Sequence, residues 1–129
     1  MYIDSIKEIE IIGKTIVKIE GLYHFSEKVS FIFSDGDKLV MQHPGTYSNV
    51  EVDDICGDIE DLLNSPLLRA EEVKHLNLPA KESYQSNYTW TFYKFATIKG
   101  YVDIKWYGTS NGYYSEECSL RYYKACDVQ

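Results

Sequence analysis

The stretch from Tyr88 to Tyr114 constrains the fold more than any other part of this 129-residue chain. Residues 89–98 and 101–107 are rich in aromatic and β-branched side chains, which suit a pleated sheet better than a helix. Lys99-Gly100 lies between them as a two-residue loop, the length that favours a tight hairpin turn. The stretch therefore predicts an antiparallel ladder at the centre of a small, mostly β domain.

We predict that Ile98 pairs with Tyr101 across this turn. Side chains alternate between the two faces of a strand, so the ladder has one apolar face that we expect to meet the core. That face consists of Tyr93, Phe95, Thr97, Val102, Ile104 and Trp106. On the other face this register places Lys94 opposite Lys105, and two like charges in that position repel each other. The repulsion needs an offset, such as Asp103, a carboxylate from elsewhere in the fold, or a bound anion.

The outward face of the ladder combines aromatic rings with two ammonium groups, and Phe92 lies opposite Tyr107 in the predicted register. Rings beside ammonium groups are the chemistry that stacks a base and holds a phosphate. With three residues of the following turn, the candidate ligand site consists of Trp90, Phe92, Lys94, Lys105, Tyr107, Asn111, Tyr113 and Tyr114. In the alternative interpretation the rings pack under another element while the lysines extend to water, and packing is the commoner role of aromatic stripes.

Residues 108–112 (GTSNG) predict a second turn. The Asn-Gly dipeptide is a strong hairpin signal, because both central residues of a type I′ turn need a positive φ. A tight turn would point the polar neighbours of Cys118 and Leu120 towards the core and these two apolar residues towards solvent. The alternation of side chains would then be out of step by one residue. We therefore predict one extra residue, a β-bulge, at Gly108 or Gly112.

The rest of the chain predicts short strands and one short helix. Strand patterns occur at residues 14–21, 29–33, 38–42, 50–52 and 67–73. Asp58 is the expected N-cap of a helix from about residue 59 to 64, which Pro66 ends.

We expect an α+β fold that is mostly β, a single domain over residues 1–129 built on an antiparallel sheet of hairpins. The central hairpin ladder covers residues 88–123. Residues 74–87 are polar and predict a loop. Residues 1–12 fit a helix face and a strand equally well, so the N-terminal element stays ambiguous.

The net charge of −7 argues against non-specific binding to DNA, RNA or anionic membranes. The N-terminus lacks a basic region before an apolar run, and no apolar run approaches the ~20 residues that span a bilayer. Cys56, Cys118 and Cys126 make an odd number of cysteines, which indicates reduced thiols in a cytosol. We expect neither nucleic acid nor a membrane as a partner.

No catalytic motif is evident, and we expect a protein that is not an enzyme and has no metal or cofactor. The acidic group at the predicted helix consists of Asp53, Asp54, Asp58, Glu60 and Asp61. It lacks the loop of an EF-hand, and acidic residues are favourable at a helix N-terminus without any metal. His24, His43 and His75 show no ligand spacing with the cysteines, and no glycine-rich phosphate loop opens a helix.

Four phrases of the sequence occur together in a known family. They are GKTIVKIEG at 13–21, FSDGDKLVMQH at 33–43, VEVDDICGDIEDL at 50–62 and YTWTFYKFATIKGYVDIKWYGTSNGYYSEE at 88–117. The chain resembles a family of small uncharacterised bacteriophage and prophage proteins, catalogued as a domain of unknown function. The resemblance implies a phage product in the host bacterial cytoplasm, and it brings no established activity with it.

The leading expectation is a non-enzymatic counter-defence protein that sequesters a small anionic, nucleotide-like ligand. Trp90, Phe92 and Tyr107 would stack the base, while Lys94 and Lys105 would neutralise phosphate. The first alternative is an acidic inhibitor that binds a host defence enzyme, such as a nuclease, through Asp53, Asp54, Asp58 and Asp61. A further alternative is a phage structural or assembly protein. The aromatic outward face would equally suit a homo-oligomer interface.

Overall fold

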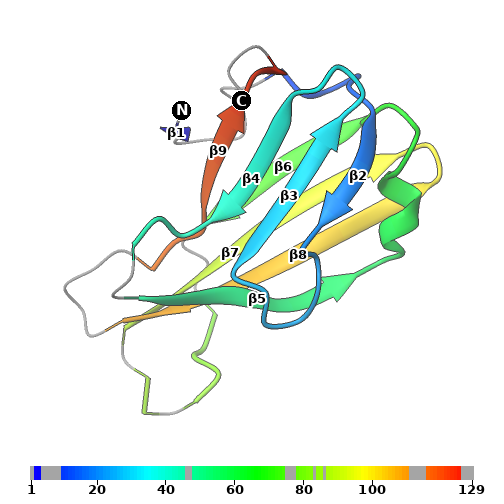
Figure 1. Cartoon of the computed structure of the whole chain (residues 1–129). Helices are drawn as coiled ribbons and strands as arrows, with labels where there is room; N and C mark the ends of the chain where they lie inside the picture. The colour runs from blue at the N-terminus through cyan, green and yellow to red at the C-terminus, as the bar shows by residue number, and fades with distance from the viewer. Residues whose placement is uncertain are drawn as a thin grey trace.

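A computed structural model shows two antiparallel sheets packed face to face (Figure 1). The structure describes residues 2–3 (backbone alone), 10–45, 48–74, 78–82, 84–85, 87–110 and 116–125. The first sheet consists of β1 (Tyr2–Ile3), β9 (Ser119–Tyr123), β4 (Lys38–Gln42), β3 (Lys28–Phe33) and β2 (Ile16–Glu20), in that order. The second sheet consists of β5 (Asn49–Cys56), β8 (Gly100–Thr109), β7 (Tyr88–Thr97) and β6 (Arg69–Lys74). The prediction of a mostly β single domain built from antiparallel hairpins is confirmed.

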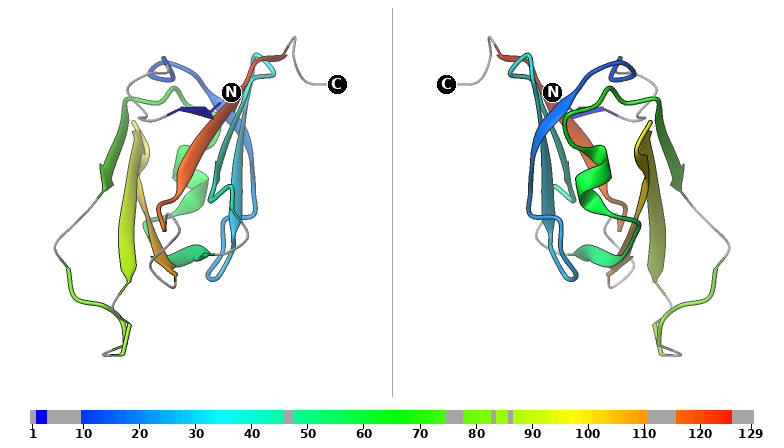
Figure 2. Two further views of the ribbon diagram at one scale, coloured as in Figure 1. Left: turned by 90° about the vertical axis from the view of Figure 1, so that its left-hand side faces the viewer. Right: turned by 90° about the vertical axis from the view of Figure 1, so that its right-hand side faces the viewer.

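The core lies between the two sheets, which Figure 2 shows as separate layers. The predicted core face of the ladder is confirmed, because its six residues are all buried. Phe95 of β7 meets Phe31 of β3 edge to face across the interior, with ring centroids 5.0 Å apart. Trp106 of β8 is fully buried beside them. Full burial of one such side chain stabilises the fold by roughly 2–3 kcal/mol, so these rings hold the layers together.

The register of the ladder differs from the prediction by two residues. Thr97 pairs with Gly100, so Ile98-Lys99 forms the turn in place of Lys99-Gly100. A shift of two keeps every side chain on its predicted face but changes its partner. Lys94 lies opposite Asp103, and the predicted pairing of Lys94 with Lys105 is wrong.

Two contacts of Asp61 explain why this register is preferred. The Thr97 hydroxyl donates a hydrogen bond to the Asp61 carbonyl, and it accepts one from the Lys99 backbone N–H at 3.2 Å. A side chain at Gly100 would clash with the Asp61 carboxylate. The 59–62 segment therefore fixes which residues turn and which begin the next strand.

The predicted hairpin between β8 and β9 is wrong. β9 crosses to the first sheet, where it pairs with β4 and β1, and β8 pairs with β5 and β7. The bulge lies in β5, where the register shifts at Asp53, and Gly108 pairs regularly with Val50. Gly112 lies outside the described residues. Cys118 and Leu120 are buried as predicted, but they reach the core from the opposite layer.

The remaining strands fall on the predicted patterns, and β5 extends beyond its pattern to Cys56. The predicted helix is a single 3-10 turn, η2 (Ile59–Leu62). Its N-cap is Asp58, as predicted, whose carboxylate accepts a hydrogen bond from the Glu60 N–H at 3.0 Å. No helix within the described residues is long and apolar enough to span a bilayer.

Asp37, in the β3–β4 turn, ties this turn to β9 and to the segment before β2. Its carboxylate accepts hydrogen bonds from the Tyr122 hydroxyl, from Lys14 Nζ at 2.9 Å and from the Ala125 N–H at 2.9 Å. Lys14 also pairs with Asp35. The bonds from Tyr122 and Lys14 lower the pKa of Asp37 from 3.8 to about 2.

This shift predicts an acid-sensitive contribution to stability. Because the folded pKa of Asp37 lies below its unfolded value, the stabilisation is present above about pH 4 and is lost as the pH falls towards 2. We expect Asp37→Asn to reduce the decline in unfolding free energy between pH 5 and pH 2 by about 1–2 kcal/mol. Urea unfolding at a series of pH values measures it, with the exposed Glu20→Gln as the matched control. An equal decline in wild type and Asp37→Asn would contradict the prediction.

Candidate functional site

Five residues of the predicted ligand site share the outer face of the second sheet. They are Trp90, Phe92 and Lys94 on β7, and Lys105 and Tyr107 on β8. The other three, Asn111, Tyr113 and Tyr114, lie outside the described residues. The five residues are side by side as the alternation along the strands predicts, but their cross-strand partners differ from those expected.

Each of the two lysines lies opposite a carboxylate on a neighbouring strand. Lys94 stands between Asp103 of β8 and Glu71 of β6. Lys105 pairs with Phe92 of β7 on one side and with Asp54 of β5 on the other. Its ammonium lies 5.4 Å from the centroid of the Phe92 ring. Opposite charges in such positions attract, although neither lysine forms an ion pair among the described residues.

The segment around residues 78–85 covers the aromatic end of this face. The Trp90 indole N–H donates to the Pro79 carbonyl at 3.2 Å, and the Tyr88 hydroxyl donates to the Leu78 carbonyl at 2.9 Å. Tyr107 is 6% exposed. The rings at this end therefore pack beneath another segment of the same chain.

Tyr107 is the main attachment point for this covering segment. Its hydroxyl donates to the Gln85 side-chain oxygen and accepts the Lys81 backbone N–H at 3.1 Å. The Lys81 ammonium lies 5.5 Å from the Tyr107 ring centroid and pairs with Asp53 at the bulge of β5. Burial raises the pKa of Tyr107, which keeps its hydroxyl protonated as a donor.

The acidic residues predicted as an alternative site have separate roles in the fold. Asp53 pairs with Lys81, and Asp58 caps η2. Asp61 lies against Gly100. Asp54 and Asp58 are the exposed members of this group, and Asp58 is engaged as the cap, so Asp54 is the member best placed to meet a partner. Glu60, which is not in the predicted set, is exposed beside them on η2.

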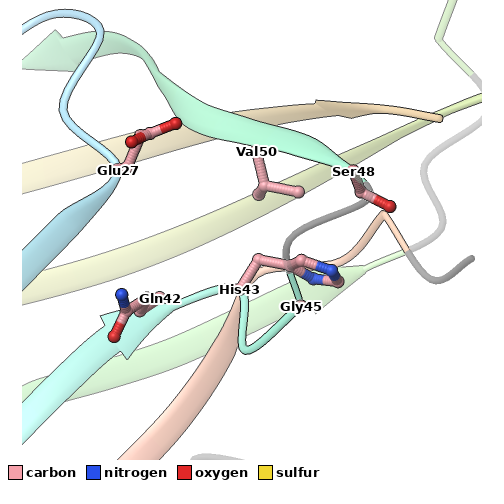
Figure 3. Close-up of a pocket in the computed structure, with 6 residues that line it drawn as sticks. All are labelled: Glu27, Gln42, His43, Gly45, Ser48 and Val50. Carbon is pink, nitrogen blue, oxygen red and sulfur yellow. The ribbon is translucent and has the colours of Figure 1, made fainter.

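A polar pocket of about 270 Å³ lies where three segments meet (Figure 3). It is lined by Glu27, Gln42, His43, Gly45, Ser48 and Val50. The Nδ1 of His43 lies 2.8 Å from the Glu117 carbonyl, which can only accept, so Nδ1 carries the proton. In the neutral ring Nε2 is then an acceptor, and the Glu27 carboxylate is another. The lining therefore suits a ligand that donates hydrogen bonds.

No local sequence pattern indicates this pocket. Glu27 precedes β3, Gln42 ends β4 and Val50 lies on β5, so strand pairing alone brings them together. The His43-Pro44-Gly45 segment is recognisable in the sequence only as a loop.

The two described cysteines are free thiols in contrasting places. Cys56 is exposed, whereas Cys118 is fully buried and burial raises the pKa of its thiol well above the usual range. Cys118 is therefore unsuited to act as a nucleophile. Cys126 lies outside the described residues, which contain no group of three His, Cys, Asp or Glu side chains placed to hold a metal ion.

Removal of the Tyr107 hydroxyl tests the role of the covering segment. Tyr107→Phe deletes both hydrogen bonds to residues 81 and 85 while it leaves the ring in place. We expect a loss of about 1 kcal/mol in unfolding free energy and faster amide hydrogen exchange confined to residues 78–85. Tyr101→Phe, at an exposed position on the same strand, is the control and should change neither. Unchanged exchange in Tyr107→Phe would show that the hydroxyl does not hold the segment.

Comparison with known proteins identifies the family to which the chain belongs. No curated protein and no solved structure matches the chain. The resemblance to an uncharacterised family is confirmed at the level of the domain, since a family model matches most of the chain. The chain belongs to the family described as Domain of unknown function (DUF7448), whose model matches residues 9–120.

Proposed function

We propose that this protein is a non-enzymatic phage accessory protein that acts in the host cytoplasm by binding another protein. Its task in this proposal is counter-defence: it covers a basic site on a host defence enzyme, such as a nuclease. The single observation that carries the choice of a protein partner is the charge pairing on the ladder, where Lys94 and Lys105 both lie opposite carboxylates.

A phosphate on this face would meet acidic groups as well as lysines. Asp103 lies opposite Lys94, and Asp54 lies opposite Lys105, so an anion drawn to either ammonium is repelled by its neighbour. Trp90 and Tyr107 lie under the 78–85 segment, so a base would have to displace that segment in order to stack on them. A nucleotide would therefore meet carboxylates beside both lysines and the 78–85 segment over two of the three rings, which supports a protein partner instead.

Several features suit a basic protein partner. Asp54 and Glu60 are exposed along β5 and η2. A net charge of −7 attracts a cationic protein at long range and raises the association rate. The pocket beside the start of β5 presents the Glu27 carboxylate, which would accept hydrogen bonds from a lysine or arginine of the partner.

A second candidate is a small anionic ligand at the Phe92–Lys105 pair. Here the ammonium lies 5.4 Å from the centroid of a ring that is only half-buried, and within the described residues of the 78–85 segment no hydrogen bond or ring contact reaches Phe92. Native mass spectrometry of the purified protein distinguishes this candidate. A retained nucleotide that is lost in Lys105→Ala, with no captured protein, would replace the proposal.

The main test is affinity capture from a bacterial lysate at low ionic strength. We expect a specific protein to be retained by the wild type and reduced roughly tenfold by Asp54→Asn/Glu60→Gln, because two exposed charges are removed from the interface. Glu10→Gln/Glu20→Gln is the matched control: it changes the net charge equally at exposed positions away from β5 and η2. Equal loss in both variants, or no specific protein, would contradict the proposed surface.

A further inference from the structure

The outer face of the first sheet carries three lysines that form no ion pair among the described residues, Lys18, Lys28 and Lys38. Strand registers place Lys18 and Glu20 of β2, after its register shift, and every second residue of β3, β4 and β9 on this face, away from the core. Its charged members are four cations and one carboxylate, namely Lys18, Lys28, Lys38, Arg121 and Glu20. We call this surface the cationic face. It is unexpected in a chain with 20 acidic and 13 basic residues.

No carboxylate lies opposite any of the three lysines. Lys18 pairs with Ile32, Lys28 pairs with Gln42, and Lys38 lies between Ile32 and Tyr123. Within the described residues these lysines form no ion pair. On the other sheet, Lys94 and Lys105 also form no ion pair among the described residues, but each of them lies opposite a carboxylate.

Arg121 lies against an aromatic ring on the same face. Its Nη1 donates to the Tyr123 hydroxyl at 3.2 Å, and its guanidinium lies 5.9 Å from the ring centroid. Among the residues whose side chains are described, Tyr123 is the only aromatic residue on the cationic face. The contact with Arg121 occupies its ring. Among the residues whose side chains are described, the face therefore offers ammonium groups without an open ring for a base to stack on.

We infer that the cationic face is a docking surface for an acidic protein. Lys18 and Lys38 lie on strands separated by β3, about 10 Å apart across the sheet, so their ammonium groups can meet separate carboxylates of one partner. Like charges on one face repel, and an acidic partner relieves that repulsion when it binds.

Charge and chemistry favour an acidic protein over a nucleic acid. Both carry negative charge, but a nucleic acid presents a dense line of phosphates that a protein of net charge −7 repels at long range. Binding of a single strand also relies on exposed rings that stack with bases. The only ring described on this face, that of Tyr123, is engaged by Arg121.

This inference goes beyond the proposed function, which rests on Asp54 and Glu60 of the other sheet. The two surfaces carry charges of opposite sign and lie on different sheets. An experiment that contradicts one proposal therefore leaves the other in place. Together they would let one domain contact a basic and an acidic partner.

The test uses a fluorescent poly-L-glutamate peptide and a single-stranded oligothymidine as separate probes, with fluorescence anisotropy as the readout. Lys18→Gln/Lys28→Gln/Lys38→Gln removes three positive charges from the cationic face. The matched control, Arg69→Gln/Lys94→Gln/Lys105→Gln, removes three from the outer face of the second sheet, so both variants have the same net charge. Thermal unfolding confirms that each variant is folded. If the first triple variant unfolds, the three single lysine-to-glutamine variants replace it.

We expect the wild type to bind polyglutamate and the cationic-face variant to bind it at least about tenfold more weakly, while the control stays within about twofold. Raising the salt from about 0.05 to 0.15 M should weaken the wild-type complex. Each single variant should give part of the loss. Equal loss in both triple variants, tighter binding of oligothymidine, or no polyglutamate binding would each overturn the inference.

Discussion

Burial of the aromatic residues between the two sheets determines which side of every strand faces solvent. Phe31, Phe95 and Trp106 fill the interior from both layers, and each removes a large apolar area from water. Because side chains alternate along a strand, placing these rings inside places their neighbours outside. The composition of the two outer surfaces follows from this one constraint.

The two outer faces differ in how their charges are arranged. On the second sheet, lysines and carboxylates alternate across neighbouring strands, as with Lys94 between Asp103 and Glu71. On the first sheet, Lys18 and Lys38 have apolar or aromatic partners. Among the described residues, a chain with a net charge of −7 thus presents one face of alternating charges and one face on which lysines outnumber carboxylates. Electrostatic complementarity of this kind sets partner choice and association rate more than it sets affinity.

Periodicity in the sequence was sufficient to predict the strands and the core face of the ladder. The alternation of Tyr93 and Phe95 with more polar residues specifies which side is buried. It does not specify the register, because a shift of two residues keeps every side chain on its face. The actual register depends on Asp61 against Gly100 and on Lys94 opposite Asp103, and neither contact has a local signal.

The predicted hairpin between β8 and β9 is wrong for a similar physical reason. An Asn-Gly dipeptide after β8 favours a local hairpin, whereas the strand that follows pairs with β4 across the sandwich. Leu120 has an apolar partner, Met41, in that distant strand, and short-range patterns do not reveal it. The pocket between Glu27 and His43 also depends on distant segments, so it too becomes visible only in the folded chain.

The charge arrangement of the second sheet depends most directly on the pairing of β7 with β8, because this register places Asp103 opposite Lys94 and Phe92 opposite Lys105, so that the two lysines do not face each other. Cross-strand nuclear Overhauser effects between backbone protons of the isotopically labelled protein measure that pairing. The account predicts contacts that join Lys94 to Asp103 and Phe92 to Lys105. Contacts that join Lys94 directly to Lys105 would contradict it, since two opposed lysines would restore an anion site on the ladder.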